Sequence, residues 1–217
     1  MNMALSCAKT HKKTGILLVN LGSPDSPNTV AVRRYLREFL WDPRVVNIPR
    51  AVWWVILTFL VLPFRPKNSA PAYQKIWTEK GSPLVCISQQ LARKLIDTTG
   101  HQFRIELAMR YGVPSIPNKL SLFKQDKIEK LLVLPLYPQY SSTTTASVFD
   151  SVITEIKTWQ HIPDFEFISD YHQNPVYIQS VADSIKEYRN QYGSGEKLLM
   201  SFHGLPERSI KLGDPYY

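Results

Sequence analysis

The sequence predicts an α/β fold in which helices cover a mostly parallel sheet. Two observations lead to this prediction: short apolar runs alternate along the chain with amphipathic stretches, and several of these runs end in turns that contain glycine or proline. Such alternation is typical of strands joined by right-handed helical crossovers. The 217 residues, 44% of them hydrophobic, allow a sizeable core. A disordered tail and a disulfide-stapled miniprotein are therefore excluded.

The first half of the chain contains one clear strand and two clear helices. Residues 15–22 (GILLVNLG) form a continuous apolar run that ends at Gly-Ser-Pro, as a buried parallel strand does. Apolar residues then recur at helical spacing over 32–40. A second helix is predicted to begin at Pro83, because proline is favoured at the first helical position, and to end at Gly100.

The second half continues the alternation. Strands are predicted at 103–109, 130–137, 165–168 and 197–202, and helices around 148–156 and over 175–192. The segment QYGSGE, with two glycines and a serine, precedes the final strand and resembles a linker. We therefore predict a first domain over 14–194 and the start of a second over 195–217.

Residues 51–64 (AVWWVILTFLVLPF) form the most apolar run of the chain. Fourteen residues are too few to cross a bilayer unaided. Two interpretations remain open: a buried helix, or an exposed hydrophobic lip bracketed by Arg50 and Arg65. The sequence predicts a soluble or peripheral protein, with no membrane-spanning segment.

The charge balance is basic, with 26 Lys and Arg against 18 Asp and Glu, a formal net charge of +8. This favours an acidic partner such as nucleic acid, an anionic membrane surface or a carboxylated small molecule. The cations are scattered, apart from groups at 9–13 and 65–67, and no nucleic-acid-binding motif occurs, so we expect no nucleic-acid partner. The two cysteines, Cys7 and Cys86, form no CxxC pair, which favours a reducing compartment.

Unusual sequence follows four of the predicted strands at their carboxyl ends, where open α/β sheets bind ligands. These stretches are NLGSP, RYG, YPQYSSTTTAS and SFHGLP. The last contains His203, which a buried strand would deliver to the edge of the sheet, where an imidazole can bind a metal or accept a proton. Its position leaves a functional role and an ordinary packing role equally open. Neither GxGxxG nor GxxxxGK[ST] occurs, so dinucleotide or ATP binding is not expected.

Five motifs together resemble the amino-terminal two-thirds of the ferrochelatase family: GILLVNLGSP, GSPL, AMRYG, LYPQYSSTTTAS and SFHGLPERSIKLGDPYY. The resemblance extends over 14–217. Ferrochelatases insert Fe(II) into protoporphyrin IX in the last step of haem biosynthesis. The resemblance implies a chelatase-type fold of two similar Rossmann-like domains, the second truncated here. It also places residues 51–64 at the family's hydrophobic lip, which favours the exposed interpretation.

The resemblance also implies roles for individual residues. His203 matches the active-site histidine that binds metal or takes pyrrole protons. Residues that match porphyrin contacts are Leu21, Arg65, Tyr73, Ser82, Arg110, Tyr111 and Tyr137. Arg65, Lys67 and Ser82 suit the anionic propionates. Fe(II) and the porphyrin are substrates and no organic cofactor is implied. Ser142 stands where some family members have a cysteine ligand of a [2Fe–2S] cluster, so no cluster is expected.

Three readings of function follow. The first is a cytoplasmic ferrochelatase, with peripheral contact at the inner face of the membrane through 51–64. The others are a non-catalytic porphyrin- or haem-binding relative, and a chelatase for another metal or for coproporphyrin. Leu21, where a tyrosine would indicate coproporphyrin, favours protoporphyrin. The family's acidic partner of the histidine lies beyond Tyr217, so we expect residues 1–217 alone to be nearly inactive and poorly stable.

Overall fold

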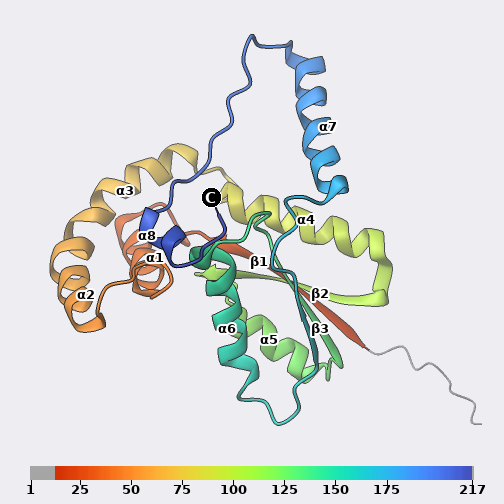
Figure 1. Ribbon diagram of the computed structural model, residues 1–217, viewed down its shortest axis with the longest axis horizontal. Coiled ribbons are helices and arrows are strands. Elements are labelled where there is room, and N and C mark those ends of the chain that lie inside the picture. Colours follow the sequence, from red (N-terminus) through yellow and green to blue (C-terminus); the bar gives the residue numbers. More distant parts are fainter. Residues whose placement is uncertain (1–12, 217) are drawn as a thin grey trace, which may run out of the picture.

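The computed structural model describes residues 13–216, and Figure 1 shows an α/β arrangement around one parallel sheet. The sheet has four strands in the order β2-β1-β3-β4. They are β1 (Thr14–Gly22), β2 (Phe103–Tyr111), β3 (Lys130–Pro135) and β4 (Asp164–Phe167). All three neighbouring pairs are parallel. The predicted fold class is therefore confirmed.

The central strand β1 fixes the register of the sheet. Thr14 lies beside both Phe103 of β2 and Lys130 of β3, so the three longest strands begin together. Their carboxyl ends consequently meet at one edge. Leu17 and Val19 of β1 are fully buried, because β1 is paired on both sides and covered on both faces.

Helices form two layers over the sheet and a third group beyond its carboxyl edge (Figure 1). The helical elements are α1 (Thr29–Trp41), α2 (Arg50–Ile56), η1 (Leu57–Val61), α3 (Leu62–Ile76), α4 (Pro83–Thr99), η2 (Gly100–Gln102), α5 (Ile116–Gln125), η3 (Ser142–Ala146), α6 (Ser147–Ile156), α7 (Pro175–Tyr192) and α8 (Glu207–Lys211). Helices α5 and α6 pack on one face of the sheet, and α4 packs on the other. Helices α1 to α3 form a separate cluster that includes Leu21 and Tyr111, at the ends of β1 and β2.

Gly22 closes β1 in a conformation that only glycine tolerates readily. Its φ is +103°, and a Cβ atom there would lie 1.8 Å from the carbonyl oxygen of Tyr111. Glycine therefore allows β1 and β2 to end in close contact and to place their last side chains at the same edge.

Helix α5 is an element that the sequence analysis did not predict. It begins after Ser115, whose hydroxyl accepts a hydrogen bond from the Asn118 N–H, and Pro117 lies in its first turn. Both are ordinary start signals for a helix. Its buried residues Leu120 and Phe123 complete the core on that face of the sheet.

The lip, residues 51–64, is helical throughout and divides its side chains between the core and the surface. Trp53 is buried and its indole N–H donates to the Leu40 carbonyl at 2.7 Å, while Leu57 is only 2% exposed. The outward residues are Val52, Trp54, Val55, Phe59, Leu60 and Phe64. The buried-helix and exposed-lip interpretations are therefore each correct for one face. The helix also continues beyond Pro63 to Ile76.

The two adjacent tryptophans provide a direct test of this division. We expect Trp53→Ala to lower the free energy of unfolding by about 3–5 kcal/mol, because it removes a buried ring and its hydrogen bond. Trp54→Ala serves as the matched change on the exposed face, and we expect an effect of about 0.5 kcal/mol or less. Urea unfolding of the two variants measures the difference. Equal losses of stability would contradict the division.

The predicted strand at 197–202 is wrong. These residues have no regular secondary structure, and Leu199 is 92% exposed. In Figure 1 the chain leaves α7 and passes to α8 well away from the sheet. A strand requires a neighbour for its backbone hydrogen bonds, and within residues 13–216 this segment lies beside none. The strand was predicted from the hydrophobicity of residues 197–202 alone, which does not supply a neighbouring strand.

Among residues 13–216, no helix combines the length and the apolar character needed to cross a membrane.

Candidate functional site

A buried carboxylate organises the carboxyl edge of the sheet. Asp42, immediately after α1, has a side chain that is only 3% exposed. Its Oδ2 atom accepts hydrogen bonds from Arg110 Nη2 at 2.6 Å, Tyr111 Oη at 2.9 Å and Ser147 Oγ at 2.5 Å. Its Oδ1 atom accepts one from the Arg44 N–H at 2.7 Å. One carboxylate thus joins α1, β2 and α6.

This carboxylate stays ionised at neutral pH. Burial alone would raise the pKa of Asp42, but hydrogen bonds from Ser147 and from the Arg44 N–H, together with the charge of Arg110, outweigh burial and lower the pKa below its usual value. The negative charge is therefore a permanent feature of the site above the acidic range.

Arg110 is held on several sides. Besides its bond to Asp42, its Nε atom donates to the Ser147 carbonyl at 2.9 Å and to Ser147 Oγ at 2.6 Å. Its guanidinium carbon lies 4.6 Å from the centre of the Tyr111 ring. The arginine and the tyrosine are therefore positioned as a stacked pair rather than as independent side chains.

An aromatic cluster lies beside this pair. Tyr111 contacts Phe39 edge-to-face, with ring centres 5.1 Å apart, and Tyr35 at 6.5 Å. Tyr35 also contacts Tyr73 of α3 at 6.4 Å. Leu21, at the end of β1, packs against the same buried cluster. Four elements thus bring apolar and aromatic side chains together where β1 and β2 end.

Tyr137, two residues beyond β3, has a buried hydroxyl with no hydrogen-bond partner among the residues that the structure describes. Burial, followed by the nearby Tyr111 and Tyr35, raises its pKa well above the ordinary value. Burial also raises the pKa of Tyr111. Both phenols are therefore neutral at physiological pH, and the Tyr137 hydroxyl remains available as a donor.

Arg65 lies in the first turn of α3, and Ser82 lies directly before α4. Arg65 is exposed on α3, and its charge acts to lower the pKa of Tyr73, although burial raises that pKa by more. Ser82 is buried directly before α4, where its hydroxyl makes no capping hydrogen bond. A charged side chain and a hydroxyl thus lie close in sequence to the aromatic cluster.

His203 lies on the extended segment between α7 and α8. It is exposed, and its Nδ1 atom is 2.7 Å from the Gly204 carbonyl oxygen. The interpretation that a buried strand delivers this histidine to the edge of the sheet is wrong, because that strand does not form.

Asp214 attaches the chain beyond His203 to the sheet edge. Its Oδ2 atom accepts from Ser142 N and Ser142 Oγ, both at 2.7 Å, and from Ser141 Oγ at 3.1 Å. The side chain is buried, and although burial alone would raise the pKa of Asp214, the hydrogen bonds from Ser142, Tyr216 and Ser141 lower it. The motif GDPY is therefore bound to the serine-rich loop that follows Tyr137. Ser142 acts there as a double donor.

Within the part of the chain that the structure describes, no three His, Cys, Asp or Glu residues gather closely enough to hold a metal ion. Cys86 is a free thiol, while Cys7 and most of the basic group at 9–13 lie outside the described residues.

Comparison with known proteins identifies the family. The family model "Ferrochelatase" matches residues 13–217. The chain belongs to the ferrochelatase family. It is 52% identical over 207 residues to a ferrochelatase of Methylococcus capsulatus, 50% identical over 208 residues to ferrochelatase 2 of Shewanella oneidensis, and 50% identical over 217 residues to a ferrochelatase of Polaromonas. These alignments cover 95%, 94% and 99% of this chain and 63%, 64% and 58% of the respective relatives. The chain thus spans about three-fifths of the relatives' length.

The residues assigned by the ferrochelatase resemblance are brought together only in part. Leu21, Tyr73 and Tyr111 share one cluster. Arg110 stacks on Tyr111, and Tyr137 is close enough for Tyr111 to affect its pKa. Arg65 lies in the first turn of α3 and Ser82 directly before α4, whereas His203 lies on the segment between α7 and α8 and hydrogen-bonds to Gly204. The roles of all eight residues stay predictions.

The sequence analysis missed the residues that position the site. Asp42 and Ser147 hold Arg110 and Tyr111, while Asp214 attaches the carboxyl-terminal segment. The sequence signals for these residues were weak. Asp42 precedes a proline at the end of an amphipathic helix, and Asp214 lies in the motif GDPY. Neither signal indicates which distant partner a carboxylate will find.

Proposed function

We propose that this protein is a ferrochelatase that inserts Fe(II) into protoporphyrin IX, the last step of haem biosynthesis. The observation that carries the proposal is the assembly of Leu21, Tyr73 and Tyr111 with Arg110 at the carboxyl edge of the sheet, in a chain of this family. Proteins with open α/β sheets bind their ligands at the carboxyl ends of the strands.

The reaction makes three demands on the protein. The porphyrin must lose two N–H protons, Fe(II) must shed bound water, and the ring must distort so that its nitrogen lone pairs become accessible. Apolar and aromatic side chains such as Leu21, Tyr73 and Tyr111 suit the faces of a macrocycle. The neutral phenol of Tyr137 supplies a hydrogen-bond donor.

The propionate groups need cations and hydroxyls. Arg65 and Lys67 on α3 are exposed, and Ser82 has no capping hydrogen bond. We assign these three residues to the carboxylates, because charge-assisted hydrogen bonds favour anionic groups. Arg110 has a different role, since Asp42 already neutralises it. We assign it to holding Tyr111 in place.

We assign His203 to the metal and proton steps. An imidazole can accept a pyrrole proton or bind Fe(II). Support comes from its exposure and from the attachment of the following segment through Asp214. In the complete enzyme, residues 195–217 would begin the second domain and 14–194 would form the first.

We further propose a cytoplasmic protein that contacts the inner face of the membrane through the lip. Its exposed apolar side chains, including Phe59 at 60% and Phe64 at 64% exposure, support this proposal. A porphyrin is itself poorly soluble in water, so a lip at a membrane surface suits its uptake.

An insertion assay tests the reaction and its alternatives. Full-length protein is incubated without oxygen with Fe(II) and protoporphyrin IX, and haem formation is followed by absorbance against a reaction without protein. We expect haem to form faster than in that control. Porphyrin binding by fluorescence without insertion of any metal would identify a non-catalytic binder. Preferred insertion of another divalent metal, or preferred use of coproporphyrin, would identify a different chelatase.

A further inference from the structure

A groove of about 940 Å³ lies between the outer face of α1 and the α2–η1–α3 segment. It borders the aromatic cluster, because Leu57 and Leu62 belong to both, but its arginines lie on the exposed side of α1, away from the buried Tyr35. Its lining residues include Arg33, Arg37, Trp41, Trp54, Leu57 and Lys67. We call it the basic groove. Its volume is in the range of small-molecule pockets.

Three of the four cations that line the basic groove lack carboxylate partners among the described residues. Arg33, Arg37 and Lys67 form no ion pair with any residue in the range 13–216, whereas the neighbouring Arg34 pairs with Asp25. The one acidic residue of the lining, Glu38, accepts a hydrogen bond from the Gly112 N–H. The lining therefore carries more positive than negative charge, with four cations against the single carboxylate of Glu38.

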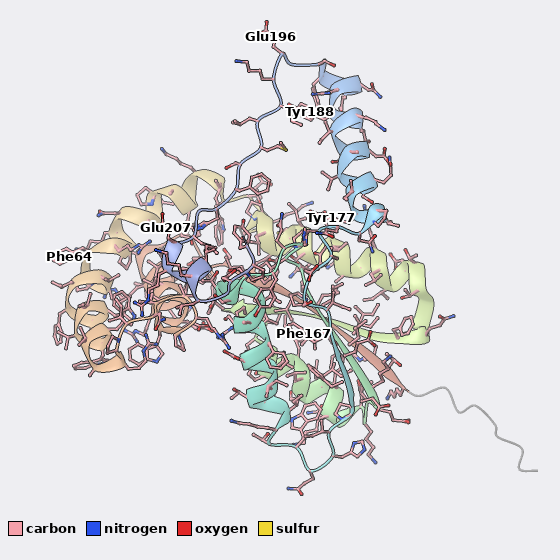
Figure 2. The ribbon with its side chains drawn as sticks, in the orientation of Figure 1. Phe64, Phe167, Tyr177, Tyr188, Glu196 and Glu207 are labelled. Carbon is pink, nitrogen blue, oxygen red and sulfur yellow. The ribbon has the colours of Figure 1, made fainter. Side chains whose placement is uncertain are left out.

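An aromatic floor and an apolar rim accompany this charge. Trp41 lies one helical turn beyond Arg37 on α1, and the Arg50 guanidinium lies 5.0 Å from its ring centre. On the facing helix, the rings of Trp54 and Phe59 contact each other edge-to-face at 5.9 Å. Figure 2 shows Phe64 at the outer edge of α3, directed away from the sheet. The cations thus share the groove with two exposed indoles, Trp41 and Trp54, and Phe59 contacts the second of them.

This combination indicates what binds there. A soluble anion would explain the cations and leave the exposed apolar rim unexplained, and a nucleic acid has no use for aliphatic side chains beside its phosphates. An amphiphile with an anionic headgroup uses both features. We infer that the basic groove binds the headgroup of an anionic phospholipid while the rim contacts the bilayer surface. The inference rests on the proposed membrane contact of the lip and deepens it by naming the class of lipid.

Binding to vesicles tests the inference. Sedimentation is measured with vesicles of neutral phosphatidylcholine and with vesicles that also contain anionic phosphatidylglycerol. We expect clear preference for the anionic vesicles. Arg33→Gln with Arg37→Gln should weaken that binding about 30-fold, because each cation near an anionic surface contributes severalfold to affinity. Arg33→Lys with Arg37→Lys keeps the charge and should retain most of the binding.

A matched control separates this site from general charge. Arg93→Gln with Lys94→Gln removes two exposed cations from α4, a helix that contributes no residue to the groove lining, and should leave binding within about twofold of the parent protein. Equal losses in the two glutamine variants would overturn the inference, as would tight binding of soluble glycerol phosphate without vesicles. Circular dichroism confirms that each variant is folded.

A second pair of variants distinguishes failure of this inference from failure of the membrane contact itself. Trp54→Ser with Phe59→Ser removes part of the apolar rim. If this change abolishes vesicle binding while the arginine variants bind normally, the lip contacts membranes and the anionic headgroup site is wrong. If the preference for anionic vesicles depends on Arg33 and Arg37 as expected, both the membrane contact and the headgroup site are supported. Haem formation in detergent-solubilised porphyrin reports on catalysis independently of either result.

Discussion

Replacement of Asp42 by alanine is expected to lower the free energy of unfolding by about 3–5 kcal/mol. The change leaves the Arg110 guanidinium and the hydroxyls of Tyr111 and Ser147 without their common acceptor in a buried location. Losing one partner of a buried ion pair is costly because the other charge stays desolvated. Urea unfolding measures the effect.

Asp150→Ala is the matched control for this prediction. Asp150 also pairs with an arginine, Arg44, at 2.7 Å, but both side chains are more than 40% exposed. Exposed pairs contribute about 1 kcal/mol or less, so the control should be nearly neutral. Equal destabilisation by the two changes would mean that the Asp42 network does not hold the site together.

The pH dependence of stability should report the same network. Because the folded pKa of Asp42 lies below its unfolded value, its charge stabilises the fold above about pH 4 and this contribution is lost as the pH falls through the folded pKa. Asp42→Asn should therefore show a shallower loss of stability on acidification than the parent protein. The pKa of Asp214 is also lowered, so Asp214 contributes to the loss of stability on acidification in both the parent protein and the Asp42→Asn variant. Identical slopes would contradict the assignment.

In full-length protein, His203→Ala is expected to reduce iron insertion by about 10²–10⁴-fold, the usual contribution of a group that transfers protons. Porphyrin affinity should stay within about twofold, because the aromatic cluster and the α3–α4 connection are untouched. The imidazole is exposed, and within residues 13–216 its hydrogen bond is to the adjacent Gly204 carbonyl, so stability should hardly change. Absorbance, fluorescence quenching and circular dichroism measure the three quantities.

His161→Ala removes another exposed imidazole at a distance from the sheet edge and should leave insertion unchanged. Substantial haem formation by well-folded His203→Ala protein would show that another group performs the proton and metal steps. A large loss of stability without loss of turnover per folded molecule would instead indicate a packing role, which the exposure of His203 argues against.

Local pattern was enough to predict most of the helices and strands between residues 14 and 194. The continuous apolar runs at β1 and β3 correspond to strands that are buried between helical layers. The helix predicted from Pro83 to Gly100 begins and ends at those residues, since Pro and Gly act through their own backbone conformations. These features depend on neighbours in sequence, and therefore they can be predicted from sequence.

Prediction failed where a distant partner decides the outcome. Residues 197–202 have the composition of a strand, but a strand forms only beside another strand. The run 51–64 is uniformly apolar, so its pattern does not distinguish Trp53, which meets α1, from Trp54, which meets solvent. Both differences arise from packing between elements that lie far apart along the chain.

The sequence by itself therefore determined the fold class and the family motifs, because hydrophobic periodicity and motifs are read directly along the chain. The candidate porphyrin contacts are what the resemblance carried by those motifs implies, and they stay predictions. Only the tertiary structure showed that Asp42 joins α1 to Arg110 and Tyr111, and that Asp214 attaches the segment after His203 to the loop at Ser142. A buried carboxylate needs several hydrogen-bond donors around it. The donors to Asp42 come from β2 and α6, and those to Asp214 come from the loop at Ser142, so both sets meet their carboxylate only after the chain has folded.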